Sequence, residues 1–299
     1  MNYIECKHRF LMFLRRHQPL KIWLILSPSV IWVFLFSFIP LLIMIYHSFV
    51  TKGPLGQILH VFTLGNYEKL SFLYLGVFWR SMRLAGMTTF FCFIIGYAVA
   101  YWIAVYGGRW RNLFIFLIVI PSWSSLLVRI YAWLFLFRDS GIINYWLLQS
   151  NIINSPIPMT FNEVGVLGCL IYTYLPFMIL PLYASIARLD RSVLEAALDL
   201  GASPFKRLIK VTIPLTKGGI ISGVVLTFIP AIGEYIIPDL VGGAKVTMMG
   251  NLIADKFLSF RNWPLGSAIT TALLIIILLL IFIYAKSEKQ SGLFEVEET

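Results

Sequence analysis

Charged residues are scarce in this sequence. Asp, Glu, Lys and Arg make up 13% of its 299 residues, about half of the ~25% usual in soluble domains. Cysteine is also rare, and Cys6, Cys92 and Cys169 are too far apart for a metal motif or a disulfide framework. The sequence has no phosphate-binding GxxxxGK(S/T) loop and no HExxH or GxSxG motif. These absences exclude a soluble domain and an ATPase, and they disfavour a membrane-embedded enzyme or a metal site.

Long apolar runs fill much of the remaining sequence, of which 59% is hydrophobic. Six runs are long enough to cross a hydrocarbon core of ~30 Å. They are too long for barrel strands, and a helix satisfies its own backbone groups in lipid. The predicted spans cover residues 22–49, 78–105, 113–137, 164–186, 213–238 and 265–285. The sequence therefore predicts an all-α membrane protein with six transmembrane helices.

The basic residues predict the orientation of these helices. An even number of spans places both termini on one side, where fifteen Lys and Arg residues lie against eight on the other. This imbalance favours cytoplasmic termini. The net charge of +10 does not indicate nucleic-acid binding, because the basic residues lie beside the spans. We expect a basic amphipathic segment on anionic membrane lipid (1–21), a first helix (22–49), a five-helix core (78–285) with a cytoplasmic loop (188–213), and a cytoplasmic tail (286–299).

The cytoplasmic loop contains the polar stretch EAALDLGASPFKRLIKVTIPL, residues 195–215. Ser192 can cap a helix over 193–200, and Gly201 can end it in the left-handed conformation. Ser203 can cap a second helix that opens with Pro204, and Pro214 breaks the pattern where the fifth span begins. The small side chains of Ala196, Ala197 and Ala202 would let another protein approach closely. An amphipathic loop lying on the membrane is the alternative.

This stretch resembles the EAA motif of ABC-importer permeases, in which Glu-Ala-Ala is followed by a Gly and, further on, by Ile-x-Leu-Pro. The matching positions are Glu195, Ala196, Ala197, Gly201 and Pro214, while Val211 and Ile213 stand in for Ile and Leu. The resemblance implies a type I importer fold in which this loop is the coupling helix. It also implies a cytoplasmic ATPase dimer that binds ATP and Mg²⁺, with no cofactor in this chain. The coupling residues implied are Glu195, Ala196, Ala197, Gly201, Ser203 and Pro214.

Further motifs resemble the spermidine/putrescine permeases, most closely the putrescine-type first subunit. They are PSWSS (121–125), RIYAW (129–133), YLPFM (174–178), PAIGE (230–234), GG (242–243) and RNWP (261–264). The resemblance covers roughly residues 75–270. It implies polyamine uptake across a bacterial inner membrane, a second permease subunit and a periplasmic polyamine-binding protein. It does not separate putrescine from spermidine.

A path for a polycation needs carboxylates and aromatic faces. Glu234 is expected roughly 32 Å along the fifth span, with Asp239 at its outer end. Tyr235, Trp123 and Tyr172 are the aromatic candidates for the path.

Arg129 provides an alternative role for Glu234, because it is expected at a similar depth, roughly 25 Å into the third span. A lone charge at mid-membrane costs ~2.5–3.5 kcal/mol on insertion scales, so each of the two needs a partner. Two roles for Glu234 stay open, one facing substrate and one paired with Arg129, and the two states can alternate.

Five prolines in or at the ends of three spans predict broken helices or a kinked bundle: Pro121, Pro176, Pro181, Pro230 and Pro238. Two other functions stay open at this point. One is an ABC permease for another small solute, such as a metal ion or an oxyanion. The other is an ATP-independent secondary transporter, which is disfavoured because no internal repeat is evident.

Overall fold

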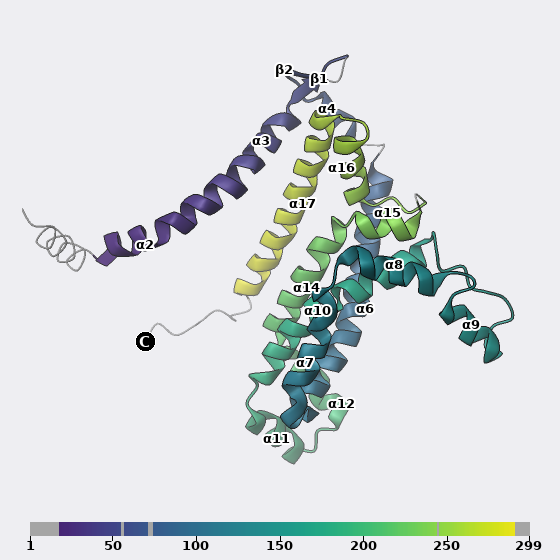
Figure 1. The fold of residues 1–299 in the computed structure, drawn as a ribbon. Helices are drawn as coiled ribbons and strands as arrows, with labels where there is room; N and C mark the ends of the chain where they lie inside the picture. Colours follow the sequence, from purple (N-terminus) through teal and green to yellow (C-terminus); the bar gives the residue numbers. More distant parts are fainter. Residues whose placement is uncertain (1–17, 55–56, 71–73, 244, 291–299) are drawn as a thin grey trace, which may run out of the picture. The chain divides into compact units, whose positions relative to one another are not determined.

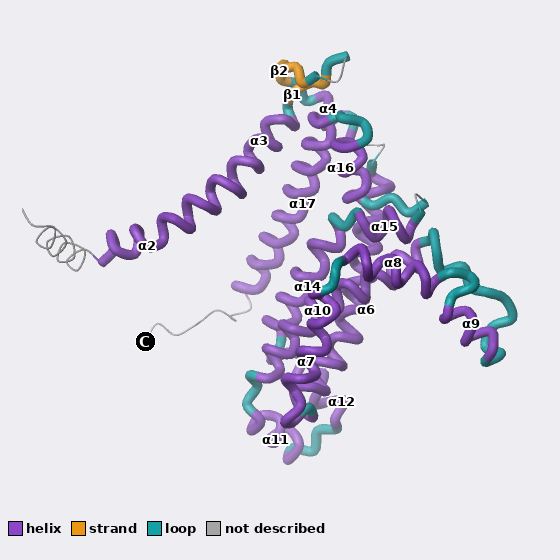
Figure 2. Tube along the Cα trace, viewed as in Figure 1, coloured by secondary structure: helices purple, strands orange, loops and turns teal. Residues whose placement is uncertain are grey.

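A computed structural model describes residues 18–54, 57–70, 74–243 and 245–290. Almost all of its regular structure is helical, apart from one short hairpin (Figure 2). The basic segment predicted over 1–21 and the predicted tail lie mostly outside the described residues. The chain divides into two compact units, residues 69–260 and the remainder at both ends. The expected core of 78–285 runs across both units, and its boundaries stay a prediction.

Four continuous helices in the described part are long and apolar enough to cross a membrane: Leu26–Ser48, Leu75–Tyr106, Glu163–Ala187 and Trp263–Phe282. Two bent pairs pass the same test when each is taken as one span. Gly108–Trp123 and Leu126–Gln149 meet at 94°, and Pro204–Leu215 and Lys217–Ile232 meet at 73°. The predicted third and fifth spans are therefore not single straight helices.

The first unit is built on the long helix at its N-terminal side. It comprises α2 (Gln18–Val33), the π-helical turn η1 (Phe34–Phe38), α3 (Ile39–Ser48), the antiparallel strands β1 (Val50–Lys52) and β2 (Ile58–Phe62), α4 (Gly65–Glu68) and α17 (Trp263–Gln290). The wide turn η1 is followed by α3, whose second residue, Pro40, has no N–H for the carbonyl four residues earlier. The buried Asn66 amide donates to the carbonyls of Ser48 (3.1 Å) and Val50 (2.8 Å). Helix α17 packs against α3, α4 and β1.

Three helices in mutual contact form the core of the second unit: α6 (Leu75–Tyr106), α10 (Glu163–Ala187) and α14 (Lys217–Ile232) (Figure 1). Gly219 and Gly223 lie one turn apart on α14 and face α10. A Cβ added to Gly219 would lie 2.4 Å from the Cβ of Ser185, and one added to Gly223 would lie 2.6 Å from the Sδ of Met178. Close packing drives helix pairing in lipid, so these glycines set the distance between α10 and α14.

The N-terminal ends of α6 and α10 are joined by polar contacts. Glu163 at the start of α10 forms ion pairs with Arg80 (3.4 Å) and Arg83 on α6. The Ser81 hydroxyl accepts a hydrogen bond (2.7 Å) from the backbone N–H of Met249, the first residue of α16 (Met249–Leu258). These contacts fix α16 against the three-helix core.

The bend in the third span has an identifiable cause. This span consists of η2 (Gly108–Trp110), α7 (Arg111–Val119), η3 (Ile120–Trp123), α8 (Leu126–Phe137) and α9 (Ile142–Gln149). Its bend follows Pro121 at the extended residues Ser124 and Ser125. Pro176, Pro181 and Pro230, by contrast, lie within continuous helices.

The fifth span differs from the expected 213–238 at both ends. The second loop helix does not stop at Pro214 but runs through α12 (Pro204–Arg207), η4 (Leu208–Thr212) and α13 (Ile213–Leu215) before it bends at Thr216. At the other end α14 stops at Ile232, and α15 (Ile236–Gly242) follows after three residues. Of the predicted prolines, Pro121 thus precedes a break, whereas Pro176, Pro181 and Pro230 do not interrupt their helices.

The polar loop forms two short helices, as its sequence predicts. Gly201 has φ +73° after α11 (Arg191–Asp199), and the Ser203 hydroxyl caps α12 by accepting from the N–H of Lys206 (3.3 Å). The predicted cap of the first helix is wrong. Asp190 caps α11 by accepting from the N–H of Ser192 (2.9 Å), because the helix begins two residues earlier than the pattern suggested.

We predict that Gly219→Ala destabilises the second unit. The added Cβ would lie 2.8 Å from the backbone carbonyl of Pro181, so α10 and α14 must move apart. Overpacking of this kind costs about 1–3 kcal/mol. The midpoint of thermal unfolding of the detergent-solubilised protein is the measurement. Gly218→Ala is the matched control, because nothing lies within 4 Å of its Cβ position; equal midpoints for the two variants would contradict the prediction.

We also predict that α11 frays in acid. Hydrogen bonds from Ser192 lower the pKa of Asp190 below its ordinary 3.8. A carboxyl group with a lowered pKa stabilises the fold while it is ionised, and this contribution is lost as pH falls through the lowered value. Amide hydrogen exchange in α11 should therefore quicken as pH falls below about 3.8, relative to intrinsic rates. Asp190→Asn keeps an acceptor oxygen and should remove this pH dependence; the same acid response in that variant would refute the assignment.

Candidate functional site

The polar loop presents an apolar surface that the sequence did not predict. Leu200 is 89% exposed and Phe205 is 71% exposed, one on each side of the turn at Gly201. Ala197 was expected at the surface but is buried, and it packs inward from α11. Alanine spacing alone cannot say which face of a short helix points inward. We call Leu200, Gly201 and Phe205 the loop tip.

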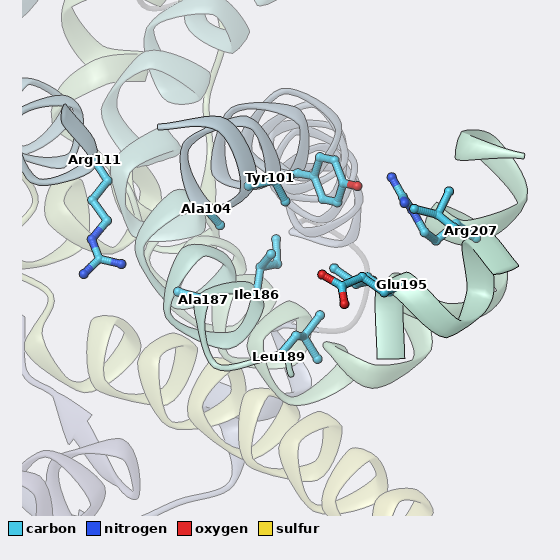
Figure 3. A pocket seen from close by; sticks show the side chains of 11 residues that line it. Tyr101, Ala104, Arg111, Ile186, Ala187, Leu189, Glu195 and Arg207 are labelled. Atoms are coloured by element: carbon cyan, nitrogen blue, oxygen red, sulfur yellow. The ribbon is translucent and has the colours of Figure 1, made fainter. Parts of the chain in front are cut away.

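A cavity of about 330 Å³ lies behind the loop. Its walls include Tyr101 of α6, Arg111 of α7, and Glu195 and Arg207 of the loop. Figure 3 shows the Tyr101 phenol and the Arg207 guanidinium group directed toward each other, with Arg111 at the opposite end. Glu195, the acidic residue of the motif, thus lies at the junction of α6, α10 and the loop. The Nε atom of Arg207 is buried without a hydrogen-bond partner in the described chain.

A second candidate site lies at the break between α14 and α15. Glu234 occupies this break, and its Oε1 accepts hydrogen bonds from the N–H groups of Tyr235 (3.1 Å) and Ile236 (3.0 Å). Its Oε2 accepts a hydrogen bond of 2.7 Å from the Tyr174 hydroxyl on α10. The carboxylate therefore supplies partners for backbone groups that the interrupted helix leaves free. We call the segment Gly233–Tyr235 with the Tyr174 contact the Glu234 break.

Helix α16 supports the Glu234 break from another side. A Cβ on Gly250 would lie 2.3 Å from the carbonyl oxygen of Gly233, so only glycine allows this approach. The Asn251 side chain donates to the carbonyl of Tyr235 (2.8 Å) and accepts from the N–H of Met248 (3.1 Å). Sequence reasoning missed Gly250 and Asn251, because nothing in their local pattern links them to Glu234. The RNWP and GG motifs nearby gave no indication of either.

The depth of Glu234 also differs from the expected value. The 16 residues of α14 give a length of roughly 24 Å, and α13 is bent away from this axis by 73°. The expected 32 Å counted from Ile213 is therefore too long. Asp239 follows on α15, where its side chain is exposed, and the ring of Tyr235 is 45% exposed.

The other predicted path residues do not gather at the Glu234 break. Trp123 is 72% exposed at the end of η3 and packs edge-on against Phe116. Tyr172 packs against the ring of Trp133 instead. Tyr174, which belongs to the YLPFM motif and was not among the candidates favoured from the sequence, is the aromatic residue that binds Glu234.

The structure does not form the ion pair between Glu234 and Arg129. The printed ion pairs of the described residues join Glu163 to Arg80 and Arg83 of α6, and within 4.0 Å none joins Arg129 to Glu234. Arg129 instead lines a cavity with Tyr172. Tyr172 and Tyr174 are two residues apart on α10, so they point about 200° apart around its axis. Helix α10 therefore separates Arg129 from Glu234.

Comparison with known proteins places the chain in a family. Residues 92–289 match the family described as the inner membrane component of binding-protein-dependent transport systems. The chain is 41% identical over 259 residues to the spermidine/putrescine transport system permease protein PotB of Haemophilus influenzae, covering 86% of this chain and 91% of that protein. PotB of Escherichia coli is 39% identical, with 86% and 94% covered. The inner membrane ABC transporter permease protein YdcU of Escherichia coli is 27% identical, with 93% and 92% covered.

Solved structures show the same fold. A chain of a bacterial ABC transporter involved in the import of alginate matches with a TM-score of 0.70 at 16% identity, covering 94% of this chain and 99% of that one. A chain of the MetNI methionine ABC transporter matches with a TM-score of 0.55 at 16% identity, with 75% and 98% covered. These matches confirm the predicted permease fold. The secondary-transporter alternative is set aside, and the protein is a transport subunit and not an enzyme. The chain belongs to the family of binding-protein-dependent inner membrane components, as a permease subunit of an ABC importer.

Proposed function

We propose that the importer takes up polyamines, putrescine or spermidine. The relatives at 39–41% identity are named spermidine/putrescine transport system permeases and are covered over at least 90% of their length. The observation that carries the proposal is the position of Glu234, a carboxylate fixed in a helix break on the membrane-spanning part of the chain. Its anionic charge and the neighbouring Tyr235 ring suit a flexible polycation.

The bonding of Glu234 leaves room for substrate. An ionised carboxylate has about four lone-pair sites, and three are used by Tyr174, Tyr235 and Ile236. An alkylammonium group can take the remaining site and lie over the half-exposed ring of Tyr235 as a cation–π contact. The fixed geometry lowers the entropy lost on binding. The same negative charge disfavours an oxyanion as cargo.

We further propose that the loop tip docks on a cytoplasmic ATPase dimer, which binds ATP and Mg²⁺. Exposed Leu200 and Phe205 provide the apolar anchors for this contact, and Lys206 and Lys210 follow on the same segment. Since α12 to α13 lead directly into α14, a pull on the tip would be transmitted to the helix that ends at the Glu234 break.

The remaining partners follow from this architecture. A second, different permease subunit would complete the pathway, and a periplasmic polyamine-binding protein would deliver the cargo. The alginate transporter with its oligosaccharide-bound periplasmic protein gives a precedent for such delivery in this fold. Both termini would lie in the cytoplasm, as the distribution of Lys and Arg indicates.

We predict that Glu234→Gln reduces polyamine uptake at least ten-fold. The variant keeps the size of the side chain but removes the charge that attracts the ammonium group, and ten-fold corresponds to about 1.4 kcal/mol. Uptake of radiolabelled putrescine and spermidine into proteoliposomes with the complete complex is the measurement. Asp255→Asn on the exposed face of α16 is the control and should keep normal uptake. Normal uptake by Glu234→Gln would exclude the substrate role.

We also predict that Leu200→Ser with Phe205→Ser uncouples the permease from the ATPase. Both side chains are already exposed, so their loss should leave folding unchanged while the anchors of the interface disappear. Co-purification of the ATPase subunit and substrate-stimulated ATP hydrolysis should both fall more than ten-fold. Asp199→Ala, an exposed change in the same loop, is the control. Undiminished ATPase binding by the double variant would contradict docking at the tip.

A further inference from the structure

A cavity at the bend of the third span contains an arginine without a counter-charge. The cavity measures about 180 Å³ and is lined by η3, α8 and α10 through Ser122, Arg129 and Tyr172, among others. The Nε of Arg129 and the hydroxyl oxygen of Ser122 are both buried, and neither has a hydrogen-bond partner in the described part of the chain. Two donors from different elements therefore line the same cavity.

Arg129 carries a charge that is partly withdrawn from solvent. A guanidinium group stays charged at every physiological pH, so burial cannot neutralise it. Within the described ranges, no carboxylate lies within 4.0 Å of the charged nitrogens of Arg129. Glu234 is held on the opposite side of α10 by Tyr174, Tyr235 and Ile236. The described part of the chain therefore supplies no counter-charge for Arg129.

The cavity is open to such a group. The cavity is partly open at the surface of the chain, and its lining residue Leu117 on α7 is 53% exposed. The residues around Arg129 on α8, Leu127, Val128 and Tyr131, are exposed and mostly apolar. The volume far exceeds the ~10–15 Å³ that one water needs. A side chain entering from a neighbouring helix therefore fits both the size and the apolar rim.

We propose that this cavity receives an aspartate or glutamate side chain from the second permease subunit. A carboxylate can accept from the guanidinium group of Arg129 and from the hydroxyl of Ser122 at once, which satisfies both buried donors. The cationic substrate is excluded as an occupant by the charge of Arg129. The inference rests on the proposed pairing of two permease subunits and adds the residue that specifies the partner. Arg129 is thus an interface residue and not part of the polyamine path.

Charge replacement in the complete transporter tests this assignment. Arg129→Met should lower the amount of second permease subunit that co-purifies with the chain at least ten-fold, and Arg129→Lys should lower it less, because it keeps the charge. Ser122→Asp provides an internal counter-charge, so it should lower co-purification to a similar extent while the chain itself remains folded. Arg129→Glu should regain the partner when one intramembrane acidic residue of the second subunit is changed to Lys.

Photo-crosslinking gives a readout that does not depend on these variants. A benzoylphenylalanine in place of exposed Leu117 should crosslink to the second permease subunit, whereas the same probe in place of exposed Phe90 on α6 serves as the comparison position. Crosslinking no stronger from position 117 than from position 90 would overturn the proposal.

Three further outcomes would also overturn it. One is an unchanged yield of the second subunit with Arg129→Met, and another is the failure of every charge swap. The third is an anionic phospholipid, measured by phosphorus analysis, that is lost from Arg129→Met while the second subunit stays bound. A wild-type chain that purifies without any second permease subunit would refute the proposed pairing of two permease subunits. The proposed polycation path through Glu234 would not be affected, because Glu234→Gln tests it separately.

Discussion

A helix that stops inside a membrane leaves backbone N–H and C=O groups without partners, and hydrocarbon supplies none. The structure meets this constraint with protein groups at both ends of α14. At the Glu234 break, a carboxylate, a tyrosine hydroxyl and an asparagine amide surround three residues of non-helical backbone. At the other end of α14, the buried Thr216 hydroxyl contacts the carbonyl of Thr212 and the hydroxyl of Tyr97. Tyr174 belongs to α10 and Tyr97 belongs to α6, so these contacts connect the two ends of α14 to both of its neighbours in the core.

Because the interruptions must be held by side chains, they also concentrate polar chemistry inside an apolar molecule. Glu234 shows this most clearly, since the carboxylate that completes the backbone hydrogen bonding is also the charge available to a cation. The helix that ends there begins at the loop with an exposed apolar tip. A single element thus joins the surface suited to an ATPase with the charge suited to a substrate, and close glycine packing against α10 keeps that element in register.

The local chemistry of the loop could be predicted from the sequence in most details. Gly201 and Ser203 take the positions that their backbone preferences indicate, and Pro204 opens the second helix. The first cap was misplaced because Asp190 and Ser192 are both good capping residues, and the actual helix start decides between them. The burial of Ala197 and the exposure of Leu200 depend on how α11 packs against α12 and η4. Short helices with small residues carry too weak an apolar pattern to indicate that orientation.

The sequence by itself determined the class of the protein, because apolar length, scarce charge and the EAA spacing follow from local composition and order. It also located the polar loop and singled out Glu234 and Arg129 as charges that require partners. Only the tertiary structure decided who those partners are. Helix α10 places Tyr174 toward Glu234 and Tyr172 toward Arg129, and it separates the two charges that sequence depth alone had brought together. Depth along a helix can be counted from residue number, whereas the direction in which a side chain points depends on bends and on rotation about the helix axis, which packing sets.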